Sequence, residues 1–247
     1  MDRVALVTGG SRGVGAATVL ALVRRGVDVA FTYRSRRRRA EQVVARAAAC
    51  GRDVLPVQCD LTDLPATRRM LAEIGCWRAR VDVLVLNASG GLEQDLAAAD
   101  PDYPMRINRD AQVALVEMAR PVLASDATVV LVTSHWAHLY GRVPQLPAYE
   151  PVARSKHAGE SALRELLADS GARLIVVTGD LVEGTVTPKL LERVSRGLVD
   201  RRQREAGRLP TADDMGEAIA AAALDPTLPS GHTVAVGADP SSLLGPG

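Results

Sequence analysis

The sequence predicts an α/β fold in which a seven-stranded parallel sheet is covered by helices on both faces. Short runs rich in apolar and β-branched residues alternate with longer helical patterns along the 247 residues. Most of these runs are apolar throughout, as is typical of strands that are buried on both faces. The expected strands are Val4 to Thr8, Val27 to Tyr33, Val54 to Cys59, Val81 to Asn87, Thr128 to Ser134, Arg173 to Thr178 and Thr233 to Val236. The expected helices are Val14 to Arg25, Arg37 to Cys50, Asp63 to Glu73, Pro104 to Leu123, Val152 to Asp169 and Asp213 to Ala223.

Local signals support these elements and their order. Gly26 follows two arginines and suits the end of the first helix, whereas Asp63 precedes a helix that has a proline in its first turn. Pro56 is tolerated only at a sheet edge, where the doubly wound, Rossmann-type order 3-2-1-4-5-6 places the third strand. We therefore expect one Rossmann-type domain over residues 1–247, and the charged, amphipathic stretch 184–210 is expected to form a flap over a substrate.

Composition excludes several classes of protein. The chain has 30 Lys and Arg against 29 Asp and Glu, so it lacks the excess of positive charge that is typical of nucleic-acid-binding proteins. Cys50, Cys59 and Cys76 form no CxxC pair and no ligand spacing with histidine, which disfavours a zinc site and indicates a reducing compartment. No segment approaches about 18 consecutive apolar residues, and we expect a cytoplasmic protein without a membrane span.

The sharpest motif is the glycine-rich turn 8–15, TGGSRGVG, between the first strand and the first helix. Backbone that approaches a pyrophosphate closely cannot carry β-carbons, and the N-terminus of the following helix offers amide donors and a favourable dipole. Because the motif stands between a strand and a helix, it predicts a dinucleotide site rather than a plain tight turn. The residues of this turn that are expected to bind the cofactor are Thr8, Gly9, Ser11, Arg12, Gly13, Val14 and Gly15.

The end of the second strand indicates which dinucleotide is bound. Enzymes that select NAD usually place an acidic residue here, which accepts a hydrogen bond from the ribose 2′-hydroxyl. In this chain the strand ends in Arg34 and Ser35, and no carboxylate follows before Glu41. Arg34 and Arg12 offer forked donors that suit a 2′-phosphate, so the sequence predicts NADP(H). Nucleic-acid binding by the basic run 36–39 is the weaker alternative, because no aromatic residues are interleaved with it.

Several later segments, like the glycine turn, resemble motifs of the short-chain dehydrogenase/reductase family. Asp60-Leu61 is similar to the segment that holds the adenine amino group, and Asn87-Ala88-Ser89-Gly90 resembles the family's NNAG segment. Thr178-Gly179 stands in place of a proline-glycine pair. The resemblance implies a Rossmann-fold reductase, often a homo-oligomer, that acts on a small molecule. It further implies that the cofactor is bound by Arg34, Ser35, Asp60, Leu61, Asn87, Ala88, Ser89, Lys156, Gly179 and Leu181.

The chain departs from the family at the expected catalytic centre. The family has a tyrosine four residues before a lysine and a serine on the fifth strand. Lys156 is present, but Val152 stands four residues before it and has no proton to give. Tyr149 lies seven residues before the lysine, about one helical turn out of register, while Ser134 matches the serine and His135 competes with it. The residues that the resemblance implies as catalytic are Asn108, Ser134 and Lys156.

Loss of the tyrosine weakens carbonyl reduction without forbidding it, because hydride transfer needs only the cofactor, alignment and a polarised carbonyl group. Three sources of the proton remain open: a side chain, an ordered water and an acidic hydroxyl group of the substrate itself. The candidate side chains are Ser134, His135, Tyr149 and Lys156. We expect the substrate or a water, because no residue occupies the place of the tyrosine.

Aromatic residues suggest the shape of the substrate. Trp136, Tyr140 and Tyr149 follow the fifth strand, in the loop that rims the pocket of a parallel sheet. They predict either a loop packed by its own aromatic side chains or a stacking wall for a flat ligand. His135 and His138 lie close together, but no carboxylate or cysteine stands at ligand spacing, so no metal is expected.

The whole chain is also similar to ketoreductases that act on angucyclinones, which are tetracyclic aromatic polyketides. This similarity implies NADPH-dependent reduction of the C-7 ketone to a secondary alcohol in antibiotic biosynthesis. A hypothesis of another class is a non-catalytic NADP(H) sensor that binds a partner protein. Val152 favours the sensor, whereas Lys156, Asn108 and Ser134 favour the enzyme.

Overall fold

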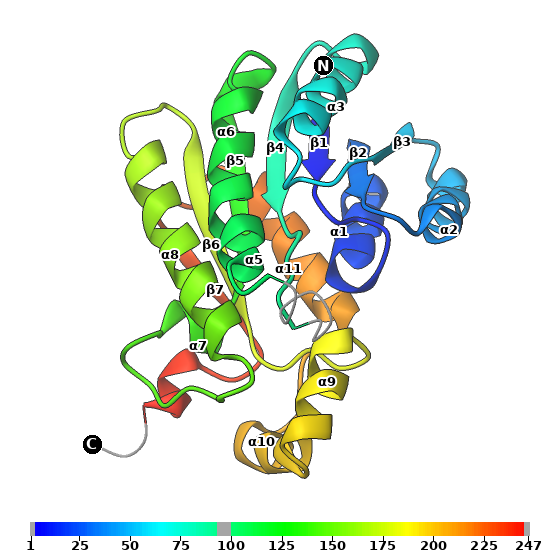
Figure 1. Ribbon diagram of the computed structural model, residues 1–247. Helices are drawn as coiled ribbons and strands as arrows, with labels where there is room; N and C mark the ends of the chain where they lie inside the picture. Colours follow the sequence, from blue (N-terminus) through cyan, green and yellow to red (C-terminus); the bar gives the residue numbers. More distant parts are fainter. Residues whose placement is uncertain (1–2, 93–99, 245–247) are drawn as a thin grey trace.

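The computed structural model describes residues 3–92 and 100–244, which form the expected parallel sheet. Seven strands lie in the order β3-β2-β1-β4-β5-β6-β7, and every neighbouring pair is parallel (Figure 1). The strands are β1 (Val4–Val7), β2 (Asp28–Tyr33), β3 (Val54–Gln58), β4 (Val81–Leu86), β5 (Leu123–Ser134), β6 (Arg173–Gly179) and β7 (Thr233–Val236). Strand order reverses between β1 and β4, and the carboxyl ends of strands at such a point form the crevice in which open α/β sheets bind ligands.

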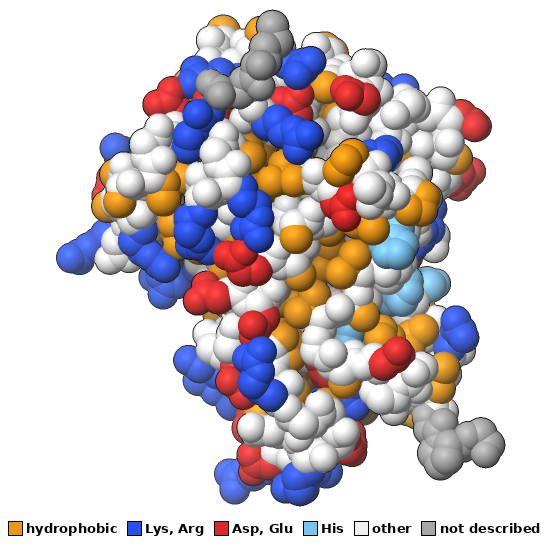
Figure 2. All heavy atoms as spheres, turned by 180° about the vertical axis from the view of Figure 1, so that it is seen from behind, with side chains coloured by type: hydrophobic (Ala, Val, Ile, Leu, Met, Phe, Trp, Pro, Cys, Tyr) orange, Lys and Arg blue, Asp and Glu red, His pale blue; other side chains and the backbone are white. Residues whose placement is uncertain are grey.

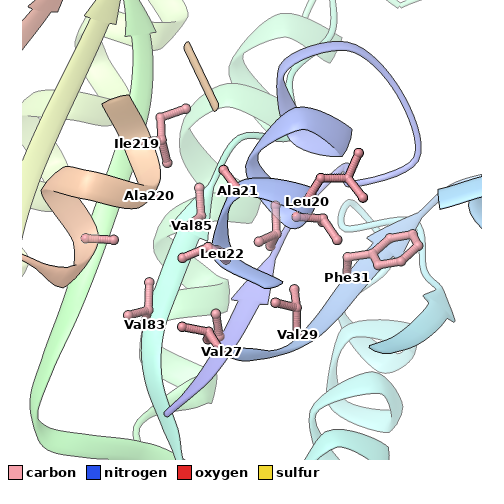
Figure 3. Packing of buried hydrophobic residues seen from close by; sticks show 14 of the residues in the cluster. Leu20, Ala21, Leu22, Val27, Val29, Phe31, Val83, Val85, Ile219 and Ala220 are labelled. Atoms are coloured by element: carbon pink, nitrogen blue, oxygen red, sulfur yellow. The ribbon is translucent and has the colours of Figure 1, made fainter. Parts of the chain in front are cut away.

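Helices cover both faces of the sheet, which confirms the doubly wound layout (Figure 1). One face carries α1 (Gly13–Arg24), α2 (Arg37–Ala47) and α11 (Ala212–Leu224), and the other carries α3 (Leu64–Trp77), α6 (Ala111–Ala119) and α8 (Glu150–Leu167). In the first layer, Leu22 of α1 and Ile219 of α11 belong to one buried cluster with Val85 of the sheet (Figure 3). Burial of both faces explains why the strands are apolar throughout.

Shorter elements complete the chain between these layers. They are η1 (Ala48–Cys50), α5 (Tyr103–Met105), the π-helical turn η2 (Arg106–Asp110), α7 (His135–His138), α9 (Val186–Val194), α10 (Leu198–Ala206) and η3 (Pro240–Leu243). The helices α9 and α10 occupy the stretch that was expected to form a flap. Within the described parts of the chain, no helix is both long enough and apolar enough to cross a membrane.

Local signals that guided the prediction are confirmed. Gly26 has a φ of 80°, in the left-handed region that glycine adopts readily. The side chain of Asp63 accepts a hydrogen bond from the amide of Ala66 at 3.0 Å and so caps α3. Pro56 lies in β3, which is the edge strand, where a missing amide proton interrupts no second ladder.

Three predicted boundaries near prolines were wrong. The helix expected over 104–123 is divided into α5, η2 and α6 and ends at Ala119, and Pro121 follows shortly after. The next strand therefore begins at Leu123 rather than at Thr128. In α8, Pro151 stands in the first turn, where the absent amide proton costs no hydrogen bond, so the helix begins before it.

Candidate functional site

A cavity of about 710 Å³ opens at the carboxyl ends of the strands. Most of the predicted site residues line it, although they come from seven separate segments of the chain. The predicted residues in its wall are Gly9, Ser11, Arg12, Gly13, Val14, Gly15, Arg34, Ser35, Asp60, Leu61, Asn87, Ala88, Ser89, Ser134, Trp136, Tyr149, Val152, Lys156 and Leu181. The topology thus gathers the dinucleotide motifs and the reductase-like residues into one continuous space.

The glycine turn between β1 and α1 forms a cradle that only glycine permits. A Cβ atom on Gly15 would lie 2.3 Å from the carbonyl oxygen of Gly9, and one on Gly9, whose φ is 68°, would lie 3.1 Å from the Cα of Ala88. Thr8 is buried below the cradle, where its hydroxyl accepts hydrogen bonds from the amides of Asn87 and Ala88, both at 2.9 Å. Thr8 therefore braces the turn and does not line the cavity, and the cradle fits a pyrophosphate.

Basic side chains rim the cavity beside this cradle. Arg12, Arg34, Arg36 and Arg39 all line it, and Figure 2 shows Lys and Arg side chains gathered over α2. Arg34 donates a hydrogen bond from Nη1 to the hydroxyl of Tyr103 at 2.7 Å. Tyr103 comes from α5, so this bond joins the end of β2 to the wall beyond β4. Sequence reasoning missed Tyr103, since nothing local marks a contact between residues 69 positions apart.

Asp60, a predicted site residue, is held by Thr62, whose amide and hydroxyl donate to its carboxylate at 3.0 and 2.7 Å. Other residues that line the cavity were not predicted. After β6, Thr185, Thr187 and Lys189 also reach the cavity from the start of α9. Their position near the glycine cradle could have been expected from the rule that all strand carboxyl ends meet at one edge of a parallel sheet.

Lys156 projects from α8 into the cavity wall, and its ammonium donates to the carbonyl oxygen of Val132 at 3.1 Å. Burial disfavours the charged form and lowers the pKa of Lys156 to about 8. The lysine is therefore still largely protonated at neutral pH, and it stands where a dinucleotide in the cradle extends toward β5.

Replacing Lys156 by methionine should raise the free energy of unfolding at pH 7 by about 2 kcal/mol. Below pH 8 the folded wild-type protein carries the full cost of a buried charge, which is relieved as pH rises from 8 toward 10.5, where the unfolded lysine titrates. The advantage of the variant should therefore shrink between pH 7 and about pH 10. Urea denaturation at several pH values measures it, and a gain that does not depend on pH contradicts the assignment.

Asn108 is not among the residues that line the cavity, and the hydrogen bonds of its side chain lead away from Lys156. It is buried in η2, where its amide donates to Ser155 Oγ at 2.9 Å and to the carbonyl oxygen of Gly90 at 3.0 Å. Its carbonyl oxygen accepts from Ser89 Oγ at 2.8 Å. Asn108 thus ties the segment after β4 to α8, a bracing contact that a single polar residue in sequence cannot reveal.

Ser134 and Tyr149 meet at the end of β5. The Tyr149 hydroxyl donates to Ser134 Oγ at 2.9 Å, and both side chains line the cavity. Val152 is buried in the same wall, so the position four residues before Lys156 offers no proton. Tyr149 lies directly before α8, and seven residues correspond to almost two helical turns, which places it on the same side as Lys156. The tyrosine is out of register, yet it still reaches the serine.

Two proposed site residues lie outside the cavity. His135 is fully buried; its Nδ1 bonds to the hydroxyl of Thr178 and its Nε2 to the carbonyl oxygen of Ala238, both at 2.9 Å. Burial lowers the pKa of His135, and both ring nitrogens are engaged, so it is no substitute proton donor. Tyr140 is also absent from the wall, because its hydroxyl donates to the carboxylate of Glu150 at 2.6 Å.

Gly179, which was expected to bind the cofactor, is not among the residues that line the cavity. A Cβ atom at this position would lie 2.7 Å from the sulfur of Met215 in α11. Its role is to let α11 pack closely on β6. The following residues, Asp180 and Leu181, do line the cavity.

Within the stretch 184–210, α9 contributes to the wall of the cavity, whereas α10 is anchored by an ion pair. Arg202 of α10 contacts both carboxylate oxygens of Asp180, with distances of 2.8 to 3.0 Å, and its side chain is 3% exposed. Arg202 also donates to Ser242 Oγ at 3.1 Å and lies over the ring of Trp136. Helix α10 is therefore held at the end of β6 by a buried ion pair.

Fold and site together define a class of protein. The sheet places a glycine cradle, a lysine and a serine around one cavity, and this arrangement is that of an oxidoreductase that binds a nicotinamide dinucleotide. The chain belongs to the short-chain dehydrogenase family, whose family model, described as short chain dehydrogenase, matches residues 3–196.

Named relatives agree with this family. The chain is 30% identical over 197 residues to versicolorin reductase 1 of Aspergillus parasiticus, covering 78% of this chain and 73% of the relative. It is 33% identical over 176 residues to a hydroxynaphthalene reductase of Aspergillus fumigatus, covering 69% of this chain and 62% of the relative.

Solved structures show the same fold. A short chain dehydrogenase from Burkholderia cenocepacia J2315 in complex with NADP has a TM-score of 0.80 and 29% identity, covering 95% of this chain and 96% of the other. A 3-oxoacyl-[acyl-carrier protein] reductase from Brucella melitensis in complex with NAD has a TM-score of 0.81 at 23% identity, covering 100% and 99%.

Proposed function

We propose that the protein is an NADPH-dependent ketoreductase that converts a ketone of a polycyclic aromatic polyketide to a secondary alcohol. The observation that supports this most is the shared cavity, which is lined by the glycine cradle, Lys156 and Ser134. NADPH, when bound, supplies the hydride that adds to the carbonyl carbon, and the carbonyl oxygen takes up a proton from another source. The products are the alcohol and NADP⁺.

The preference for NADPH over NADH is proposed from the charges around the adenosine end. Arg12, Arg34 and Arg39 line the cavity there together with Ser35, and no acidic side chain stands at the end of β2. A guanidinium group binds a phosphate through two parallel hydrogen bonds, which a ribose hydroxyl cannot match. Arg34 is the best placed of these residues, because Tyr103 holds its guanidinium at the cavity wall.

Replacing Tyr103 by phenylalanine should raise the Kd for NADPH about 3- to 10-fold, because a hydrogen bond of this kind contributes about 0.5–1.5 kcal/mol. The Kd for NADH should stay unchanged, since no 2′-phosphate is then present. Fluorescence titration of the two cofactors measures the ratio. Equal weakening of both cofactors would instead mean that Tyr103 supports the adenosine pocket as a whole.

The substrate class is proposed from the size and the lining of the cavity beyond the nicotinamide end. Trp136, Leu146, Val152 and Leu190 are apolar and lie in the wall, which suits a flat hydrophobic ligand. Relatives are named as reductases of versicolorin and of hydroxynaphthalene, the second by name a hydroxylated aromatic ring system. The resemblance to the angucyclinone ketoreductase of simocyclinone biosynthesis makes the angucyclinone C-7 carbonyl our specific candidate.

The proton is proposed to come from the substrate or from a water. Val152 holds the place from which the family's tyrosine acts, and His135 lies outside the cavity. A phenol adjacent to the ketone already shares its proton with the carbonyl oxygen and can deliver it as the alkoxide forms. A positioned acid of this kind accounts for a rate factor of about 10² to 10⁴.

The test compares a polycyclic hydroxy-ketone with the same ketone masked as a methyl ether. NADPH oxidation followed by absorbance should proceed with the free hydroxyl and fall about 100-fold or more with the ether. A matched ether at a remote ring position controls for size. Full activity on the masked ketone would exclude the substrate as the proton source.

A non-catalytic NADP(H) sensor is the second candidate, and Val152 is the observation that favours it. The same experiment separates the two proposals, because a sensor binds NADPH tightly yet oxidises none of it across a panel of polycyclic ketones. The side chains that α9 adds to the cavity wall favour the enzyme, since a sensor needs no substrate space beside the nicotinamide.

A further inference from the structure

The hydroxyl of Ser134 has a particular hydrogen-bond arrangement. Its oxygen accepts the amide proton of Ala137 at 3.2 Å, as the cap of α7, and accepts the phenol proton of Tyr149 at 2.9 Å. A hydroxyl group has two acceptor lone pairs and one proton to donate. Both lone pairs are used by the protein, so the proton of Ser134 is left to point into the cavity that its side chain lines.

The direction of the bond from Tyr149 follows from its surroundings. Tyr149 is 6% exposed, and burial raises the pKa of its phenol, which therefore stays protonated at neutral pH. The backbone is held on both sides, since the amide of Tyr149 donates to Leu146 at 2.8 Å and its carbonyl accepts from Ala153 at 2.9 Å. Ser134 Oγ is thus the acceptor within reach of a fixed donor.

We propose that Tyr149 is a positioning residue that acts through Ser134, by directing the serine proton at the carbonyl oxygen of a bound ketone. This rests on the proposed ketoreductase function. A hydroxyl that accepts two hydrogen bonds is a stronger donor of its own proton, because hydrogen bonds in a chain polarise one another. Ser134 then polarises the carbonyl group as hydride arrives, and the proton that finally remains on oxygen still comes from the substrate or a water.

The arrangement is distinct from direct donation by a tyrosine. The Tyr149 hydroxyl donates its hydrogen bond to Ser134. Tyr149 lies directly before α8, about one turn ahead of Val152. The ammonium of Lys156 bonds to the carbonyl oxygen of Val132. In this chain a serine therefore makes the contact with the carbonyl oxygen, and the tyrosine orients it.

The test is a double-mutant cycle with Tyr149→Phe and Ser134→Ala. Tyr149→Phe should lower kcat about 10-fold with NADPH and a polycyclic hydroxy-ketone, and leave the KM and the melting temperature close to wild type. Ser134→Ala should lower kcat about 100-fold, as expected when one donor to a developing oxyanion is lost. The double variant should be no slower than Ser134→Ala alone. Tyr140→Phe is the matched control, because it removes a tyrosine hydroxyl outside the cavity and should leave kcat unchanged.

A second readout does not need turnover. Infrared spectra of a hydroxylated anthraquinone with an isotope-labelled carbonyl, bound together with NADP⁺, report the hydrogen bond to its oxygen. The carbonyl band should lie at lower frequency in the wild type than in Tyr149→Phe, and the double variant should match Ser134→Ala. A lowered band without any NADPH oxidation would overturn the ketoreductase function and leave this inference standing.

Two results overturn the inference. One is a kcat loss from Tyr149→Phe that is as large in the Ser134→Ala background as in the wild type, which means that the tyrosine acts on the substrate directly. The other is an identical carbonyl band and kcat in Tyr149→Phe and the wild type, which means that the phenol does not orient the serine.

Discussion

Replacing Arg202 by methionine is expected to lower the free energy of unfolding by about 3–5 kcal/mol. Arg202 and Asp180 have side chains that are 3% and 0% exposed, and the arginine contacts both carboxylate oxygens. Removing the cation leaves a buried carboxylate whose remaining donor among the described residues is the amide of Leu181 at 2.7 Å. The loss of stability reflects that uncompensated charge rather than the attraction in the pair itself.

Chemical denaturation of the variant measures this loss, and Arg204→Met is its matched control on the same helix. Arg204 is exposed, so its replacement should change the free energy of unfolding by less than about 0.5 kcal/mol. Adding Asp180→Asn to Arg202→Met should recover part of the loss, since the stranded charge is then removed. Equal effects at 202 and 204 would contradict the buried pair.

Replacing Gly15 by alanine is the second large effect, and we expect it to weaken NADPH binding about 100-fold. A methyl group at this position would lie 2.3 Å from the carbonyl oxygen of Gly9 and 2.6 Å from Asn87 Nδ2, so the cradle must open. Losing two backbone hydrogen bonds to a charged pyrophosphate, each of about 1.5 kcal/mol, corresponds to this factor.

Calorimetric titration with NADPH measures the change, and Gly75→Ala in α3 is the control. Its added methyl group would lie 3.3 Å from Cγ1 of Val122, a contact that a shift of a few tenths of an ångström relieves, and alanine favours a helix over glycine by about 1 kcal/mol. Gly75→Ala should keep the wild-type Kd. A wild-type Kd in Gly15→Ala would show that the pyrophosphate does not lie on this turn.

The sheet and the cradle could be predicted because local chemistry determines them. The turn at Gly13 and Gly15 needs residues without side chains, and apolar strands that alternate with helices leave few topologies open. Val152 lies in the same cavity wall as Lys156, because helix periodicity puts residues four apart on one face.

Contacts between distant segments could not be read from the sequence. Arg202 and Asp180 look like two surface charges until α10 folds over the end of β6. Tyr149 was discounted as a direct proton donor because it stands about one helical turn out of register, whereas in the fold it directly precedes α8 and its phenol donates to Ser134. Each of these contacts depends on where an irregular segment returns to the sheet, which no local pattern encodes.

The contacts of segment 238–242 also set an order of assembly. His135 bonds to the carbonyl oxygen of Ala238, 103 residues later in the chain, and Arg202 donates to Ser242, 40 residues later. A ribosome delivers these partners only after the strands β1 to β6 have already emerged. The nucleotide half of the sheet can therefore form during translation, whereas the contacts of His135 and Arg202 with segment 238–242 form only after that segment has been synthesised.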